Sequence, residues 1–122
     1  MDNNTLIIYD DDDDILEICR IIFSSYPLNI ITRNNSGRWR AELEEFKPAV
    51  ILMDNKIMPY GGVKIIKEIK ASEFKHIPVI FFSAHEHLEK LAEEAHADYL
   101  LKKPFDLADM KKTVENALKH LQ

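Results

Sequence analysis

The 122-residue sequence has little of several features that mark other classes of protein. Its single cysteine, Cys19, excludes an internal disulfide and is typical of a reducing compartment. No apolar run approaches the ~20 residues of a membrane-spanning helix, and the start Met1-Asp2-Asn3-Asn4 lacks the basic residues of a secretory signal. Lys and Arg number 16 against 21 Asp and Glu, so no basic stripe is available for nucleic-acid phosphates. These absences predict a cytoplasmic protein that binds neither nucleic acid nor membrane.

Hydrophobic residues make up 46% of the chain, which is enough for a globular core, and we expect a single domain over residues 1–122. Five short apolar runs read as strands. They are Leu6–Tyr9, Leu28–Thr32, Val50–Met53, Val79–Ala84 and Tyr99–Leu101.

Five segments with helical periodicity alternate with these runs. The first predicted helix starts with the acids and has apolar positions from Ile15 to Phe23, and the second is capped by Ser36 and ends at Phe46. The others run from about Val63 to Ala71, from about Glu86 to Ala95, and from a cap at Asp106 through apolar positions between Leu107 and Leu121. Such alternation predicts right-handed βαβ units and a parallel sheet covered on both faces. We therefore expect an α/β, flavodoxin-like (βα)5 doubly wound sandwich with strand order 2-1-3-4-5.

Polar side chains gather where these predicted strands end, which is the edge at which open α/β sheets bind ligands. Asp10 and Asp11 follow the first strand, and Asp54 ends the third, which is its neighbour in the predicted order. Three clustered carboxylates favour a bound cation, and Mg²⁺ suits them because it keeps waters that a phosphoryl substrate can replace. Ser83 and Lys103 would add a hydroxyl and an ammonium that can disperse phosphoryl charge, with Asp54 as the nucleophile.

Other polar residues of this region have simpler interpretations. The acids Asp12, Asp13 and Asp14 are typical of a helix start, where the helix dipole favours negative charge. The two histidines of His85-Glu86-His87 lie two residues apart and would not share a helix face, so we expect solvated side chains.

Four stretches in order give the sequence a resemblance to the receiver domains of two-component response regulators, over essentially its whole length. They are Ile7-Ile8-Tyr9-Asp10-Asp11-Asp12, Met53-Asp54, Pro78-Val79-Ile80-Phe81-Phe82-Ser83-Ala84 and Lys103-Pro104-Phe105.

The resemblance implies that the chain accepts a phosphoryl group from a histidine of a sensor kinase or of a histidine phosphotransfer protein, in a Mg²⁺-dependent reaction. It also implies roles for individual residues. These are Asp54 as phosphoacceptor, Asp10, Asp11, Asp54 and the backbone carbonyl of Lys56 as metal ligands, Ser83 as the switch hydroxyl, and Lys103, rather than Lys102, as the phosphate-contacting lysine.

The sequence departs from the family pattern in three places. The loop proline, Pro59, stands five residues after Asp54 instead of four. Leu100 occupies the position of the usual aromatic switch residue, with Tyr99 one place earlier, so we expect that switch to be missing. The segment from Ser83 to Ala97 is slightly short, which predicts a truncated fourth helix.

The leading functional hypothesis is a phosphorylation-controlled signalling module that catalyses only its own phosphorylation and dephosphorylation, with no output domain and an unidentified downstream partner. Three alternatives compete with it. The first is an aspartate-nucleophile phosphatase, which generally needs an acid where Lys56 stands. The second is a constitutive interaction domain, which would not need the set of acids, hydroxyl and lysine. The third is a flavodoxin-like cofactor binder, but the aspartates after the first strand would repel its ligand.

Overall fold

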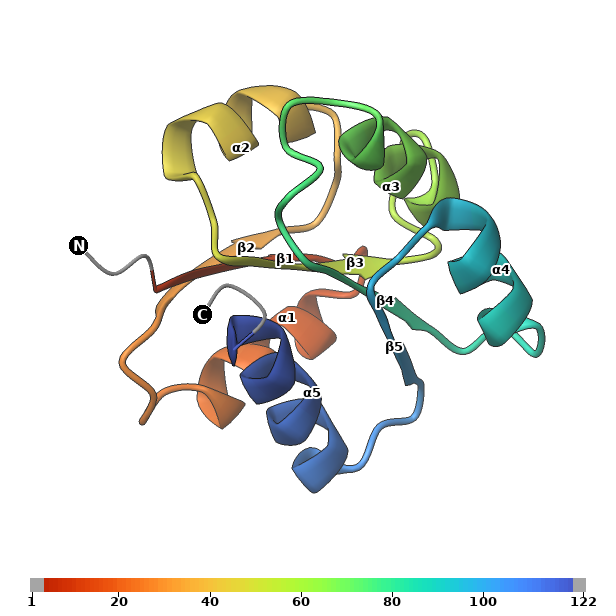
Figure 1. Cartoon of the computed structure of the whole chain (residues 1–122). Coiled ribbons are helices and arrows are strands. Elements are labelled where there is room, and N and C mark those ends of the chain that lie inside the picture. The colour runs from red at the N-terminus through yellow and green to blue at the C-terminus, as the bar shows by residue number, and fades with distance from the viewer. Residues whose placement is uncertain (1–3, 120–122) are drawn as a thin grey trace.

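The computed structural model describes residues 4–119 and contains a five-stranded parallel sheet (Figure 1). The strand order is β2-β1-β3-β4-β5, as predicted, so the flavodoxin-like fold class is confirmed. The strands are β1 (Thr5–Tyr9), β2 (Asn29–Arg33), β3 (Val50–Asp54), β4 (Val79–Ser83) and β5 (Tyr99–Lys102).

Five helices cover both faces of this sheet (Figure 1). They are α1 (Asp13–Ile22), α2 (Trp39–Phe46), α3 (Gly62–Lys70), α4 (Leu88–Ala95) and α5 (Leu107–Lys119). Helices α1 and α5 lie on one face, and α2, α3 and α4 lie on the other. The predicted apolar position Leu121 lies outside the described residues. Within residues 4–119 no helix has the length and apolar character needed to cross a membrane.

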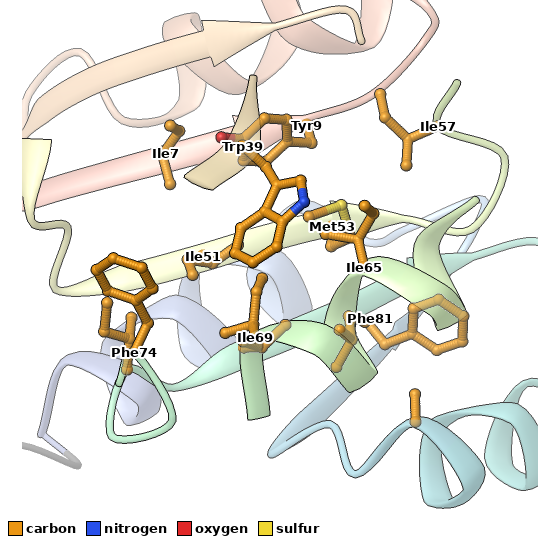
Figure 2. Packing of buried hydrophobic residues seen from close by; sticks show 14 of the residues in the cluster. Ile7, Tyr9, Trp39, Ile51, Met53, Ile57, Ile65, Ile69, Phe74 and Phe81 are labelled. Atoms are coloured by element: carbon orange, nitrogen blue, oxygen red, sulfur yellow. The ribbon is translucent and has the colours of Figure 1, made fainter. Parts of the chain in front are cut away.

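The central strands carry apolar side chains on both faces because each face is covered by helices. Every residue of β3 and β4 is buried, and alternate residues point into two separate clusters. Figure 2 shows the larger cluster, in which Trp39 of α2 and Ile69 of α3 pack toward Ile51 and Met53 of β3. This packing fixes the position of β3, and therefore of Asp54 at its end.

Two predicted helix starts are wrong. Ser36 does not cap α2: its Oγ donates a hydrogen bond to the Met58 carbonyl oxygen, and the helix begins at Trp39 without a side-chain cap. Helix α4 begins at Leu88, two residues after the predicted start near Glu86, and the residues before it form a local turn in which the His87 N–H donates to His85 Nδ1. By contrast, Asp106 accepts the Ala108 N–H at the start of α5, as a cap does.

Candidate functional site

The side chains singled out in the sequence come together at the carboxyl edge of the sheet. Asp10 directly follows β1, Asp54 is the last residue of β3 and Ser83 is the last residue of β4. All three are buried, although burial of polar groups is costly unless they are paired. Lys103 follows β5 and reaches the same point.

Lys103 joins the two buried carboxylates. Its Nζ donates hydrogen bonds to Asp10 Oδ2 at 2.8 Å and to Asp54 Oδ1 at 2.9 Å. The same ammonium lies 4.6 Å from the centre of the Phe82 ring, a distance at which a cation and an aromatic face attract each other. The neighbouring Lys102 is exposed, so the geometry distinguishes the two lysines in favour of Lys103.

Asp11 completes a group of three acids with Asp10 and Asp54. One ligand oxygen from each lies within 4.8 Å of the others, which is close enough to share a metal ion. Asp11 is exposed, whereas the other two carboxylates are buried. A pocket of about 540 Å³ opens over the group, and its walls are Asp11, Asp12, Asp13, Asp54, Lys56, Ser83, Ala84 and Lys103.

Burial and neighbouring charges shift the pKa values of Asp10, Asp54 and Lys103. Burial raises the pKa of Asp10 and of Asp54 above the usual carboxyl range, and the mutual repulsion of nearby carboxylates raises it further. The hydrogen bonds from Lys103 oppose this shift without cancelling it. For Lys103 itself, burial acts to lower the pKa, but the two carboxylates outweigh burial and the pKa is raised. Lys103 therefore remains an ammonium at neutral pH.

Backbone hydrogen bonds orient the remaining polar groups. The Lys56 N–H donates to Asp54 Oδ2 at 3.2 Å, so both oxygens of Asp54 are held. The Ser83 Oγ accepts the N–H of His85 at 2.9 Å, and the Ser83 carbonyl accepts the N–H of Lys103 at 3.0 Å. The loop after β4 is thus tied to the hydroxyl that faces the pocket.

Two acids of the α1 start are nearer to the pocket than sequence reasoning indicated. Asp12 is the N-cap of α1 and accepts the Asp14 N–H, as a helix-start acid should, yet Asp12 and Asp13 also line the pocket. The Asp12 N–H donates to Asp10 Oδ1 at 2.9 Å and helps to hold that carboxylate. Their position immediately after β1, at the same edge of the sheet, was the signal that could have revealed this role.

Tyr99 and Leu100 lie on opposite sides of β5. The Tyr99 hydroxyl donates to the Asn116 carbonyl oxygen of α5 at 3.3 Å, so the side chain is directed to the α5 face of the sheet. Leu100 is 43% exposed and lines a hollow with residues of α4. Tyr99 is therefore directed away from the α4 side of β5, where Leu100 lies.

The two histidines after β4 are exposed, as predicted. Their rings lie 5.7 Å apart, and His87 Nε2 is 3.7 Å from a Glu86 carboxylate oxygen. Both side chains border the hollow beside Leu100 rather than the acidic pocket.

The chain is similar to known proteins over most of its length. The family model described as "response regulator receiver domain" matches residues 6–115. Regulatory protein AtoC of Escherichia coli is 31% identical over 119 residues, which cover 94% of this chain and 25% of AtoC. The chain thus spans about a quarter of the length of this relative.

Solved structures with the same fold are also receivers. The N-terminal signal receiver domain of a Bacteroides fragilis response regulator superposes with a TM-score of 0.83 at 25% identity, covering 93% of this chain and 95% of that one. A Francisella response regulator receiver domain gives a TM-score of 0.88 at 20% identity, covering 98% and 100%. The family model matches residues 6–115, which is most of the chain, and the chain therefore belongs to the response regulator receiver domain family of two-component systems.

Proposed function

We propose that this chain accepts a phosphoryl group on the Asp54 carboxylate from a phosphohistidine, supplied in the cytoplasm by a sensor kinase or a histidine phosphotransfer protein. The observation that carries the proposal is the buried Asp54 carboxylate, held by the Lys103 ammonium at the wall of an open pocket. In the reaction a P–O bond forms to Asp54 and the P–N bond of the donor breaks. The imidazole nitrogen keeps the bonding electrons and takes up a proton.

The charges of the site fit a divalent cation. Three carboxylates against one ammonium leave two negative charges uncompensated when all are ionised. Oxygen ligands of this kind suit Mg²⁺, which would be held by Asp10, Asp11, Asp54 and the Lys56 carbonyl. When bound, Mg²⁺ supplies positive charge that neutralises phosphoryl oxygens.

The chain's own groups supply the rest of the charge dispersal. The Lys103 ammonium and the Ser83 hydroxyl face the same pocket as Asp54, where they can contact the oxygens of an incoming phosphoryl group. The chemistry is limited to uptake and hydrolysis of the chain's own phosphoryl group.

The signal would leave the site through the loop after β4. Because Ser83 Oγ holds the His85 N–H, a move of the hydroxyl toward a phosphoryl group would release this hydrogen bond and loosen the turn that leads into α4. The surface formed by α4 and β5, which includes the exposed Leu100, would then change for a protein partner.

Incubation with Mg²⁺ and phosphoramidate, a small donor with a P–N bond, is expected to add one phosphoryl group to the folded chain. Intact mass spectrometry measures the product, and excess EDTA should prevent it, since the carboxylates then repel the donor. Uptake that is equal with Mg²⁺ and with EDTA would contradict a metal-dependent reaction.

The stabilising effect of Mg²⁺ is expected to grow as the pH rises. The raised pKa values of Asp10 and Asp54 mean that the folded, metal-free chain binds protons more tightly than the unfolded chain. Its unfolding free energy therefore falls as the pH rises from the usual carboxyl pKa through the raised values. Mg²⁺ needs the deprotonated carboxylates, so the gain in Tm on adding Mg²⁺ should be larger at about pH 8 than at about pH 5. An equal gain at both pH values would argue against these carboxylates as ligands.

A further inference from the structure

One buried polar residue among residues 4–119 lies apart from the candidate site. The buried polar side chains of residues 4–119 are Asp10, Asp54, Ser83 and Ser36. The first three belong to the candidate site, whereas Ser36 lies in the loop between β2 and α2 and has no exposed surface. Sequence reasoning assigned Ser36 to a helix cap, a role that the structure excludes.

Ser36 holds the loop that follows Asp54. Its backbone N–H and its Oγ both donate hydrogen bonds to the carbonyl oxygen of Met58, at 2.6 Å and 3.0 Å. The side chains of Met58 and Tyr60 are 61% and 48% exposed, so the outer side of this loop has little packing. Its backbone is instead held from the inner side, by a residue 22 positions earlier in the sequence.

The other backbone hydrogen bonds of the loop after Asp54 are made within the loop or to the sheet. The Gly61 N–H donates to the Ile57 carbonyl, and the Gly62 N–H donates to the Asn55 carbonyl. The Asn55 N–H extends the β3–β4 ladder through the Phe82 carbonyl. Ile57 is buried in the cluster of Figure 2. Ser36 therefore adds a hydrogen-bonded connection from a different segment of the chain.

The residue two places before Met58 is Lys56, whose carbonyl is the proposed metal ligand. The direction of a carbonyl follows the backbone dihedral angles on either side of it, and the Lys56 N–H is already fixed on Asp54 Oδ2. The hydrogen bonds from Ser36 to Met58 restrict the backbone dihedral angles on the C-terminal side of Lys56. The same β2–α2 loop also contacts the first acidic segment, because Asn34 Nδ2 donates to Asp13 Oδ1 at 3.3 Å.

We infer that Ser36 is a positioning residue for the metal site. Its hydrogen bonds to the Met58 carbonyl fix the loop that carries Lys56. The Lys56 carbonyl is thereby preorganised to bind a metal ion together with the three carboxylates. Ser36 touches neither metal nor phosphoryl group and acts through the backbone. This inference rests on the proposed function, since it assigns a role in the same Mg²⁺ site.

Ser36→Ala tests the inference, with Ser72→Ala as the matched control. Ser72 Oγ likewise donates to a backbone carbonyl, that of Ile69, but at the end of α3 that lies away from the acidic pocket. In Ser36→Ala the backbone N–H to Met58 remains, so the variant should fold. Calorimetric titration of each metal-free protein with Mg²⁺ should show about fivefold weaker binding in Ser36→Ala and no change in Ser72→Ala.

The rate of phosphoryl uptake from phosphoramidate gives a second, independent readout. In Ser36→Ala the Mg²⁺ concentration for half-maximal rate should rise about fivefold, while the rate at saturating Mg²⁺ returns close to that of the unmodified chain. Unchanged Mg²⁺ affinity in Ser36→Ala, or an equal loss in Ser72→Ala, would overturn the role of Ser36 and leave the proposed function intact. An unmodified chain that binds no Mg²⁺ would overturn both.

Discussion

Gly62→Ala is expected to destabilise the protein by about 3 kcal/mol and to suppress phosphoryl uptake. A Cβ at this position would lie 2.4 Å from the Asp54 carbonyl oxygen and 2.9 Å from the Asn55 Cα. Both are backbone atoms at the end of β3, so no side-chain rotation can relieve the overlap. Either α3 moves away from the sheet or the Asp54 backbone shifts, and a shift displaces the proposed nucleophile.

Gly37→Ala provides the control for Gly62→Ala. The nearest atom to a Cβ at Gly37 is Asn35 Oδ1 at 3.2 Å; it accepts the Gly37 N–H but belongs to an exposed side chain, so a small shift relieves the contact. Denaturant unfolding should give a large loss of stability for Gly62→Ala and a change within about 0.5 kcal/mol for Gly37→Ala. Similar stabilities of the two variants would show that the close approach of α3 to β3 is not a constraint.

Lys103→Met is expected to lower the unfolding free energy of the metal-free protein by about 3 kcal/mol near neutral pH, because it leaves buried carboxylates without their cation. Asp10 and Asp54 lose the ammonium that lies within 3 Å of both. The same change should tighten Mg²⁺ binding, since the positive charge that competes for the carboxylates is gone. Phosphoryl uptake should nevertheless fall, because the ammonium no longer faces the phosphoryl oxygens.

Lys102→Met is the matched control for this substitution, since it removes an exposed ammonium one residue away. Thermal unfolding with EDTA measures the loss of stability in the metal-free protein, and unfolding with Mg²⁺ measures the gain from metal binding. Mg²⁺ should restore more stability to Lys103→Met than to Lys102→Met. Equal losses of unfolding free energy in the two lysine variants would contradict the ion pairs of Lys103 with Asp10 and Asp54 as the source of the stability. Weaker Mg²⁺ binding in Lys103→Met would contradict competition between the ammonium and the metal.

The fold could be predicted from the sequence because five apolar runs alternate with five helical segments. The strand ends that carry Asp10, Asp54 and Ser83 follow from the same pattern, since parallel strands end at one edge. Lys103 is different. The end of the fifth predicted strand already indicated its place at this edge, but its hydrogen bond to Asp10, 93 residues earlier in the chain, was not predicted.

The sequence was misleading about two helix starts, one displaced by a long-range contact and one by a local turn. Ser36 has the residue type and position of a helix cap. The Met58 carbonyl, 22 residues later, instead accepts both its N–H and its hydroxyl, and α2 starts at Trp39. Glu86 also resembles a helix start, but the residues just before Leu88 form a turn in which the His87 N–H donates to His85 Nδ1, and α4 starts at Leu88. Neither competing partner could be identified from periodicity alone.

The role of Asp54 as phosphoacceptor is tested by comparing the intact masses of the unmodified chain and of Asp54→Asn after incubation with Mg²⁺ and phosphoramidate. We predict that the unmodified chain gains one phosphoryl group and that Asp54→Asn gains none. The control Asp14→Asn, which removes an exposed carboxylate of the α1 start, should be phosphorylated like the unmodified chain. Phosphorylation of folded Asp54→Asn to the same extent as the unmodified chain would contradict the account.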